Sequence, residues 1–325
     1  MAFTLADLAN IEKDTLRKSV MDTLLMESDV LQDIPWETLG TLSTTVVRIQ
    51  DLPSVGFRKI NEGYSSGDGS LEQNVETVSL MGMYSDVDKV IAKTKNTIGE
   101  ARAIQQQMMV KAMSYNFNDK FINGNPETDP DEFKGLEQRV GDLNAAGFTS
   151  QYIDNGGTSG DGILLNSAER NNFLDKFEQA QYAIKGHNPE WAYMNNSTLR
   201  ATRSVLRREG LLDTTKDQFD RVISMYGSTK LSDIGVKADQ TTEILPNTET
   251  LEDAGAAEST SIYFCKYGIG EFFWGIQAYE MEVEDVGRLE GSPVFRTEVD
   301  WPLGLAQSDP YSISRLYAVI PNAST

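Results

Sequence analysis

Histidine and cysteine, which often act as catalytic bases, nucleophiles or metal ligands, are scarce in this chain of 325 residues. His187 is the sole histidine and Cys265 the sole cysteine, so zinc sites built on paired imidazoles or on several thiolates are excluded, as is an intrachain disulfide. A serine or Cys265 could still pair with His187 as a nucleophile with its general base. However, His187 lies in a turn-like Lys-Gly-His-Asn-Pro sequence, and we interpret it as a structural loop residue.

Two glycine clusters have the composition of a phosphate-binding loop. The first, with Gly63, Gly67 and Gly69, lies between two strand-like stretches and is not followed by Gly-Lys-Ser/Thr. The second, Gly268 and Gly270, lies in an aromatic run, where close packing or a β-bulge explains glycine better than nucleotide binding does. We therefore expect a structural role for both clusters and no bound cofactor.

Two acidic groups could in principle hold a hard cation through carboxylate oxygens. Their members are Asp129, Asp131 and Glu132 in one group and Glu282, Glu284 and Asp285 in the other. Neither group has the spacing of a calcium-binding loop, and carboxylates on an acidic chain usually form a solvated face. We expect no metal site, no catalytic residue and no enzymatic activity.

The formal net charge of −20 argues against a surface that binds nucleic acid through its phosphates, because such a surface needs clustered lysine and arginine. It suits an ordinary soluble protein and equally the wall of a container that must not trap a polyanion. No stretch of about 18 apolar residues is present, and the first ten residues lack the order of a secretory signal. We expect a protein made in the cytoplasm, with no membrane segment.

The elements that would position any site begin with residues 4–38, where apolar side chains recur at near-helical spacing and predict an amphipathic helical arm. These side chains are Leu5, Leu8, Ile11, Leu16, Val20, Leu24 and Leu25. Pro35 and Gly40 end the arm, and the β-branched run at 44–49 begins extended structure.

Two strand-like stretches, 55–64 and 74–84, then bracket a small, polar segment that cannot pack a core. This pattern predicts a long hairpin that projects from the body, and two strands are too few to be stable alone. We expect the hairpin tip to contact a neighbouring subunit. The residues of this predicted tip are Glu62, Gly63, Tyr64, Ser65, Ser66, Gly67, Asp68, Gly69 and Ser70.

A long helix is predicted over 97–122, since no proline interrupts it and one stripe of its surface is apolar. Further helices are predicted over 165–184 and 196–209, the latter ended by Gly210. The rest of the chain consists of short strand-like runs separated by glycine, proline or acidic turns. The order of arm, hairpin, helices and strands indicates an α+β fold.

Three local patterns, in this order, resemble the tailed-phage major capsid protein family, whose fold encapsulins and the floor of herpesvirus capsids share. The first is a helix ending in Asn-Gly at 123–124, followed by Phe-Lys-Gly-Leu at 133–136. The second is Trp-Ala-Tyr-Met-Asn-Asn at 191–196 with the helix after it. The third is Tyr226-Gly227 with the Ile-Leu-Pro sequence at 244–246.

The resemblance implies an N-terminal arm that reaches under a neighbouring subunit, an extended loop, a peripheral domain with a long spine helix, and a central or axial domain. The expected bounds are 1–52 for the arm, 53–90 for the extended hairpin loop, 91–189 and 278–315 for the peripheral domain, and 190–277 and 316–325 for the central domain.

The resemblance also implies a function and partners. Hexamers and pentamers of the chain would tile an icosahedral head that encloses double-stranded DNA without sequence-specific binding. The arm begins within the first ten residues, so the resemblance implies either a separate scaffolding protein or a scaffold segment that precedes the given sequence; a portal and a decoration protein would be further partners. The protein would reside in the virion after synthesis in the bacterial cytoplasm.

Two alternatives stay open at this point. An encapsulin-like shell subunit would use the same fold around an enzyme cargo, and sequence does not separate it from a phage coat subunit. An enzyme of unfamiliar α+β fold, centred on His187 or an acidic group, is the other. A compact monomer in gel filtration would favour the enzyme over either shell protein.

Overall fold

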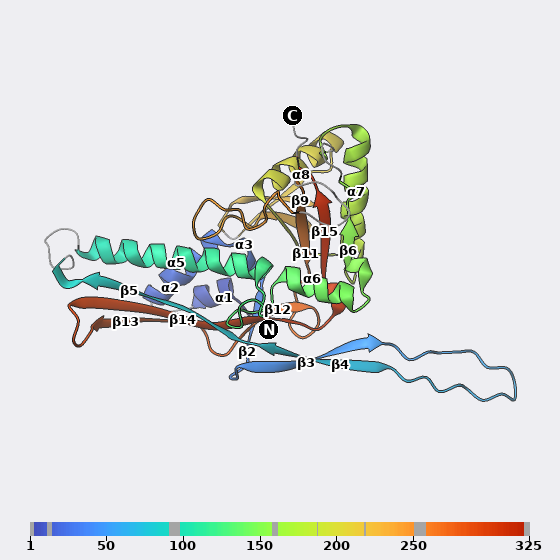
Figure 1. Cartoon of the computed structure of the whole chain (residues 1–325), viewed down its shortest axis with the longest axis horizontal. Coiled ribbons are helices and arrows are strands. Elements are labelled where there is room, and N and C mark those ends of the chain that lie inside the picture. Colours follow the sequence, from blue (N-terminus) through green and yellow to red (C-terminus); the bar gives the residue numbers. More distant parts are fainter. Residues whose placement is uncertain are drawn as a thin grey trace.

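The structure is a computed structural model, and it describes residues 3–11, 15–90, 98–157, 162–186, 188–217, 219–249 and 258–321. The chain has two limbs that meet at an angle, with a thin hairpin that extends away from both (Figure 1). One limb is a long sheet covered by helices, and the other is a broader sheet with helices on both faces. Helices and sheets contribute comparably, so the predicted α+β class is confirmed.

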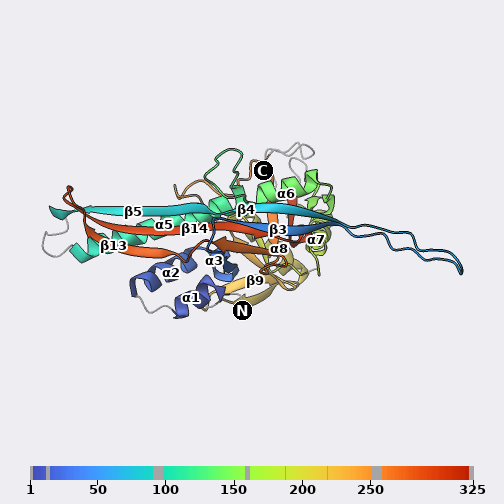
Figure 2. The ribbon, with the colours of Figure 1, turned by 90° about the horizontal axis from the view of Figure 1, so that it is seen from below.

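The long limb is a six-stranded sheet built around β14 (Val294–Gln307). β14 pairs with β5 (Ser79–Asp88) over ten residues, with β13 (Glu282–Arg288) at its outer end and with β12 (Phe273–Gln277) at its inner end. β2 (Pro35–Thr38) continues the sheet beside β12, and β1 (Phe3–Thr4) pairs with β2. The long helix α5 (Ile98–Asn123) lies along this sheet, within one residue of its predicted bounds (Figure 2).

The central limb, the broader of the two, is a seven-stranded sheet in the order β6-β15-β11-β7-β10-β9-β8. Its strands are β6 (Tyr152–Asp154), β7 (Trp191–Met194), β8 (Asp213–Lys216), β9 (Val222–Tyr226), β10 (Thr229–Asp233), β11 (Thr260–Cys265) and β15 (Ile313–Val319). Helices α7 (Ser167–Tyr182) and α8 (Asn196–Glu209) pack on one face, and α6 (Leu136–Ala145) packs on the other. Because both faces are covered, β7 and β11 are buried at every position.

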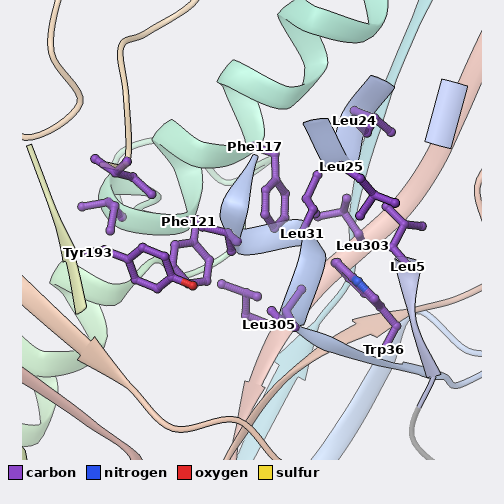
Figure 3. Packing of buried hydrophobic residues seen from close by; sticks show 14 of the residues in the cluster. Leu5, Leu24, Leu25, Leu31, Trp36, Phe117, Phe121, Tyr193, Leu303 and Leu305 are labelled. Carbon is purple, nitrogen blue, oxygen red and sulfur yellow. The ribbon is translucent and has the colours of Figure 1, made fainter. Parts of the chain in front are cut away.

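The two limbs share one apolar core at the end of α5. Phe117 and Trp301 stack at 6.4 Å between ring centroids, and Trp36 lies 4.8 Å from Trp301. Phe121 meets the edge of Tyr193 at 5.5 Å, which joins the long helix to the seven-stranded sheet (Figure 3). These contacts hold the limbs at a fixed angle, since close-packed aromatic cores resist rearrangement.

The N-terminal segment differs from the predicted arm. It forms α1 (Leu5–Ile11), α2 (Thr15–Glu27) and α3 (Asp29–Asp33), and these helices pack on their own chain. Leu24 and Leu25 are buried beside Phe117 (Figure 3), and Lys111 of α5 donates a hydrogen bond to Glu27 at 3.0 Å. Of the predicted stripe, Val20, Leu24 and Leu25 are buried in the core of their own subunit, and α2 packs on α5; that the segment also reaches under a neighbour stays a prediction.

The predicted hairpin strands also differ from the observed ones. β3 (Ser43–Asp51) pairs with β4 (Ser70–Thr77), whereas residues 55–64 form no strand. The predicted second strand, 74–84, is split at Val78 between β4 in the hairpin and β5 in the long sheet. The prediction placed the strands where apolar and aromatic residues are densest, but the ladder forms nearer the body.

The domain bounds stay a prediction, and the packing suggests a revision of them. α7 packs against β15 and β6, so the segment 136–189, expected in the peripheral domain, contacts the seven-stranded sheet. Conversely, β12 was expected in the central domain and pairs with β14 and β2 of the long sheet. We propose to group 136–189 with the central domain and β12 with the peripheral one.

The packing of α2 on α5 can be tested by Leu24→Ala. Leu24 is fully buried in the isolated chain, so the truncation should lower the free energy of unfolding of dissociated subunits by about 2–5 kcal/mol. Met26→Ala, on the exposed side of the same helix, is the control and should change it by less than about 0.5 kcal/mol. Equal effects of the two substitutions in urea unfolding would show that α2 does not dock on its own subunit.

Candidate interaction surfaces

The hairpin is the most exposed part of the described chain. Beyond the paired strands, residues 52–69 extend away from the body as two adjacent segments without regular structure, which we call the hairpin limbs (Figure 2). Gly67 approaches Ser54 so closely that a Cβ on Gly67 would lie 2.6 Å from the Ser54 carbonyl oxygen. The chain reverses at a turn in which Glu62 N–H donates to the Lys59 carbonyl at 3.1 Å.

The tip of the hairpin lies earlier in the sequence than predicted. The predicted tip residues, Glu62 to Ser70, form the returning limb, and the turn itself lies at residues 59–62. Small and polar residues therefore mark one limb, and the tip carries Ile60 instead. Contact of the tip or of the returning limb with another subunit stays a prediction.

The apolar side chains beyond the hairpin base have little cover from their own chain. Val55, Phe57 and Ile60 are each at least 91% exposed, and Leu52 and Tyr64 are more than 70% exposed. A side chain of this size gains about 1.5–3 kcal/mol when it is fully buried. Clustered apolar exposure of this kind marks a contact surface in soluble proteins.

The base of the hairpin has two different faces. On one face the cross-strand pairs Thr45–Val75, Val47–Gln73 and Ile49–Leu71 lie opposite each other, and the Val, Ile and Leu side chains among them are about half exposed or more. The other face carries Arg48, Glu72 and Glu76 and lines a polar cavity of about 250 Å³ beside α6. Burial lowers the pKa of Arg48 there. Val46 lies on this second face and is buried against Trp274, Ile276 and Ala306, so the ribbon turns Val46 and its charged groups toward the body and its exposed apolar groups outward.

A groove borders the apolar face of the base. Its volume is about 890 Å³, and apolar side chains of the hairpin line one side of it while loops of the central limb line the other. Its apolar lining residues are Val47, Ile49, Leu52, Phe148, Phe272, Pro310 and Tyr311.

A buried ion pair fixes the hairpin base to α6. Arg139 donates from its two terminal nitrogens to the two carboxylate oxygens of Glu76, at 2.6 and 2.8 Å. Its remaining donors reach the carbonyl oxygens of Leu305 at 2.8 Å and of Lys134 at 3.0 Å, and its guanidinium lies 5.7 Å from the Phe273 ring centroid. Both residues of the pair are less than 10% exposed, and every nitrogen of the guanidinium is satisfied.

Among the described residues, the candidates for chemistry form no catalytic site. His187 lies outside the described residues. Cys265 is buried in β11, where burial raises the pKa of the thiol well above its usual value and disfavours the nucleophilic thiolate. Gly270 has a positive φ of 75° in a tight turn, and Gly268 N–H donates to the Phe273 carbonyl at 3.0 Å, so this cluster has the expected structural role.

One motif in the hairpin was missed by the sequence reasoning. Residues 63–67 read Gly-Tyr-Ser-Ser-Gly, which has the pattern of a nucleophile elbow. In the structure this segment is an exposed limb, not the turn from a strand into a helix that the elbow requires, and no base lies beside Ser65 among the described residues. The pattern therefore has no catalytic context.

The acidic groups also form no site. Glu132 pairs with Lys120, and Asp129 accepts from the backbone of Asp131 at 3.2 Å in a turn. Glu282 and Glu284 lie on β13 opposite Asp300 and Glu298. Within the described ranges, no group of three His, Cys, Asp or Glu side chains could hold a metal ion, and no helix is long and apolar enough to cross a membrane.

Comparison with known proteins gives one family match. A family model described as major capsid protein GP7 matches residues 12–169, which are 158 of the 325 residues. No curated protein matches the sequence.

Solved structures resemble the chain over most of its length. An encapsulin complex, SrpI from Synechococcus elongatus, matches with a TM-score of 0.60 at 14% identity, covering 99% of this chain and 97% of that chain. The capsid of a native GTA particle matches with a TM-score of 0.55 at 12% identity and 87% coverage of each chain. A structure of Microbacterium phage Oxtober96 matches with a TM-score of 0.54 at 11% identity, covering 89% of this chain and 90% of that one. At identities this low the matches establish a shared fold.

The Arg139–Glu76 pair can be tested by Glu76→Gln. The amide keeps the shape of the side chain but leaves a buried guanidinium without its counter-ion, so the free energy of unfolding should fall by about 3–5 kcal/mol. Glu72→Gln is the control, because Glu72 is 44% exposed at its side chain and lies 3.8 Å from Arg48; it should cost less than about 1 kcal/mol. Indistinguishable urea midpoints for the two variants would contradict the role assigned to the buried pair.

Proposed function

We infer that this chain, which has the capsid fold shared by tailed phages and encapsulins, is a major capsid protein, the subunit from which a tailed double-stranded DNA phage builds its head. The family match names a major capsid protein, and the structural matches include phage and gene-transfer-particle capsids. Many copies of the chain would associate into a closed shell. The role is structural, and neither the family nor the fold brings a catalytic site with it.

One observation carries this function: the hairpin presents apolar side chains that its own subunit does not cover. Val55, Phe57 and Ile60 are each at least 91% exposed, and they belong to the part of the hairpin that extends away from the body (Figure 2). In a closed lattice each hairpin lies on an adjacent copy and buries these side chains there. The same contact is repeated at each position, so a modest free energy per contact is multiplied over the shell.

The finer assembly belongs to the same proposal. Hexamers and pentamers of the chain form an icosahedral lattice, and the returning limb from Glu62 to Ser70 contributes to the contact together with the tip. A scaffolding protein, a portal and a decoration protein complete the head. The chain is made in the host bacterial cytoplasm and ends in the virion. Its net charge of −20 keeps the enclosed DNA from binding tightly to the wall.

An encapsulin-like shell is the second candidate function. It is supported by the match to the SrpI encapsulin complex, which has a TM-score of 0.60 and covers 99% of this chain. The two functions differ in what the shell holds. Particles purified from the native source would contain double-stranded DNA in the first case and folded protein cargo in the second.

Removal of the hairpin limbs tests the proposed contact. Deletion of 55–66 joins Ser54 to Gly67, which already lie side by side, and leaves the β3–β4 ladder in place. The shortened chain should keep its circular dichroism spectrum and thermal stability but should form no closed shells in negative-stain electron microscopy.

A point substitution separates the apolar contact from hairpin length. Phe57→Ser should weaken assembly strongly, since it removes an apolar group that we place in the contact. Leu165→Ser, at a half-exposed apolar residue before α7, is the control and should assemble normally. Normal shells from the deletion would refute the proposed role of the hairpin.

A further inference from the structure

α8 carries the densest positive charge on this acidic chain. Arg200, Arg203, Arg207 and Arg208 are all exposed, within nine residues of a chain whose net charge is −20. The spacing of the first three places them on one side of the helix over about 10 Å, because α-helices rise about 1.5 Å per residue with 3.6 residues per turn. The opposite side, with Ala201, Val205 and Leu206, is buried in the central limb.

These arginines, which we call the α8 arginine stripe, have no partners among the residues that the structure describes. Among the described residues, none of the four guanidinium groups forms a hydrogen bond, an ion pair or a ring contact. The helix does not need them for its ends, since the Asn195 side chain accepts from Thr198 N–H at 2.9 Å and Gly210 provides the left-handed C-cap. Arginine at an exposed, unpaired stripe suits recognition of carboxylates or phosphates.

The same limb has a hollow of complementary chemistry. A pocket of about 470 Å³ lies between the C-terminal end of α7, the segment after α8 and the β8–β9 ribbon. Glu178 and Asp213 supply carboxylates, and Tyr182, Tyr226 and Leu211 supply flat or apolar walls. None of the α8 arginines of the same chain lines it.

The carboxylates of this pocket retain capacity for a cation. Tyr226 donates its hydroxyl to Oε1 of Glu178 at 2.6 Å, which fixes that carboxylate and leaves Oε2 without a hydrogen bond among the described residues. The side chain of Asp213 makes no hydrogen bond or ion pair within the same ranges. Carboxylates beside aromatic rings are the surroundings that a guanidinium prefers, since it can pair with one and stack on the other.

We propose that the α8 arginine stripe of one subunit docks against the Glu178–Asp213 pocket of a second copy of the chain. The proposal rests on the capsid function inferred above and adds an electrostatic contact between central limbs to the apolar contact of the hairpin. A copy is favoured over nucleic acid as the partner because the strong net negative charge repels a polyanion, whereas the chain itself carries the complementary pocket. Each subunit then offers one stripe and receives another.

The test is a charge swap, read out as self-association of the full chain by analytical ultracentrifugation at low salt. Arg203→Glu with Arg207→Glu should lower the association constant at least about tenfold, since attraction becomes like-charge repulsion. Glu178→Arg with Asp213→Arg should do the same. The four substitutions together should restore association to near the wild-type value. Arg203→Lys with Arg207→Lys keeps the charge and is the matched control.

Each outcome decides the proposal. Unchanged association of the Arg→Glu pair would overturn it, including the case in which those variants assemble normally and lose only nucleic acid. If both double variants lose association and the quadruple variant does not restore it, the two surfaces do not dock on each other but on other partners. A wild-type chain that stays monomeric would count against both this contact and the capsid function, whereas assembly that ignores the swap counts only against this contact. Thermal unfolding of the dissociated variants excludes misfolding as the cause.

Discussion

Assembly of this molecule depends on the free energy gained by burying apolar surface that the subunit cannot cover by itself. Most large apolar side chains of the described chain are buried in two clusters: one joins the long sheet and α5 to a face of the seven-stranded sheet, and the other lies on the opposite face of that sheet beneath α7 and α8. The hairpin is the main exception, with its apolar side chains exposed along the limbs, at the tip and on one face of the base. A two-stranded ribbon has no core of its own, so its apolar groups can be buried only by contact with another chain.

The rest of the fold holds that hairpin in a defined place. β14 is fourteen residues long and pairs with strands of both ends of the long sheet, so the sheet acts as one rigid element. The aromatic contacts around Phe117 and Trp301 fix the sheet to α5 and to the central limb. The Arg139–Glu76 pair then ties the hairpin base to α6. A rigidly held hairpin loses less conformational entropy on binding than a free one would, which favours regular assembly.

Sequence reasoning succeeded where the signal is local. α8 has its predicted bounds and α5 lies within one residue of them, because caps, glycine stops and uninterrupted periodicity specify a helix from neighbouring residues. It failed where the partner of an element decides the outcome. The periodicity of the N-terminal segment indicates an apolar stripe, but nothing local shows that Leu24 and Leu25 pack in a core with α5 of the same chain. Likewise, strand composition at 55–64 does not reveal that the ladder forms between β3 and β4.

The surfaces that matter for assembly were only partly visible from sequence. The hairpin was predicted, but Glu76 and Arg139 are 63 residues apart and nothing in their neighbourhoods links them. The α8 arginine stripe is visible from sequence, since arginines at 200, 203 and 207 fall on one side of a predicted helix, although the net charge of the whole chain indicates an acidic surface.

A cryo-electron microscopy reconstruction of assembled particles tests the central claim most directly. We expect Val55, Phe57 and Ile60 to be buried against an adjacent copy and α2 to remain packed on α5 of its own subunit. A shell in which these three side chains stay in solvent, or in which α2 crosses to a neighbour, would contradict that claim.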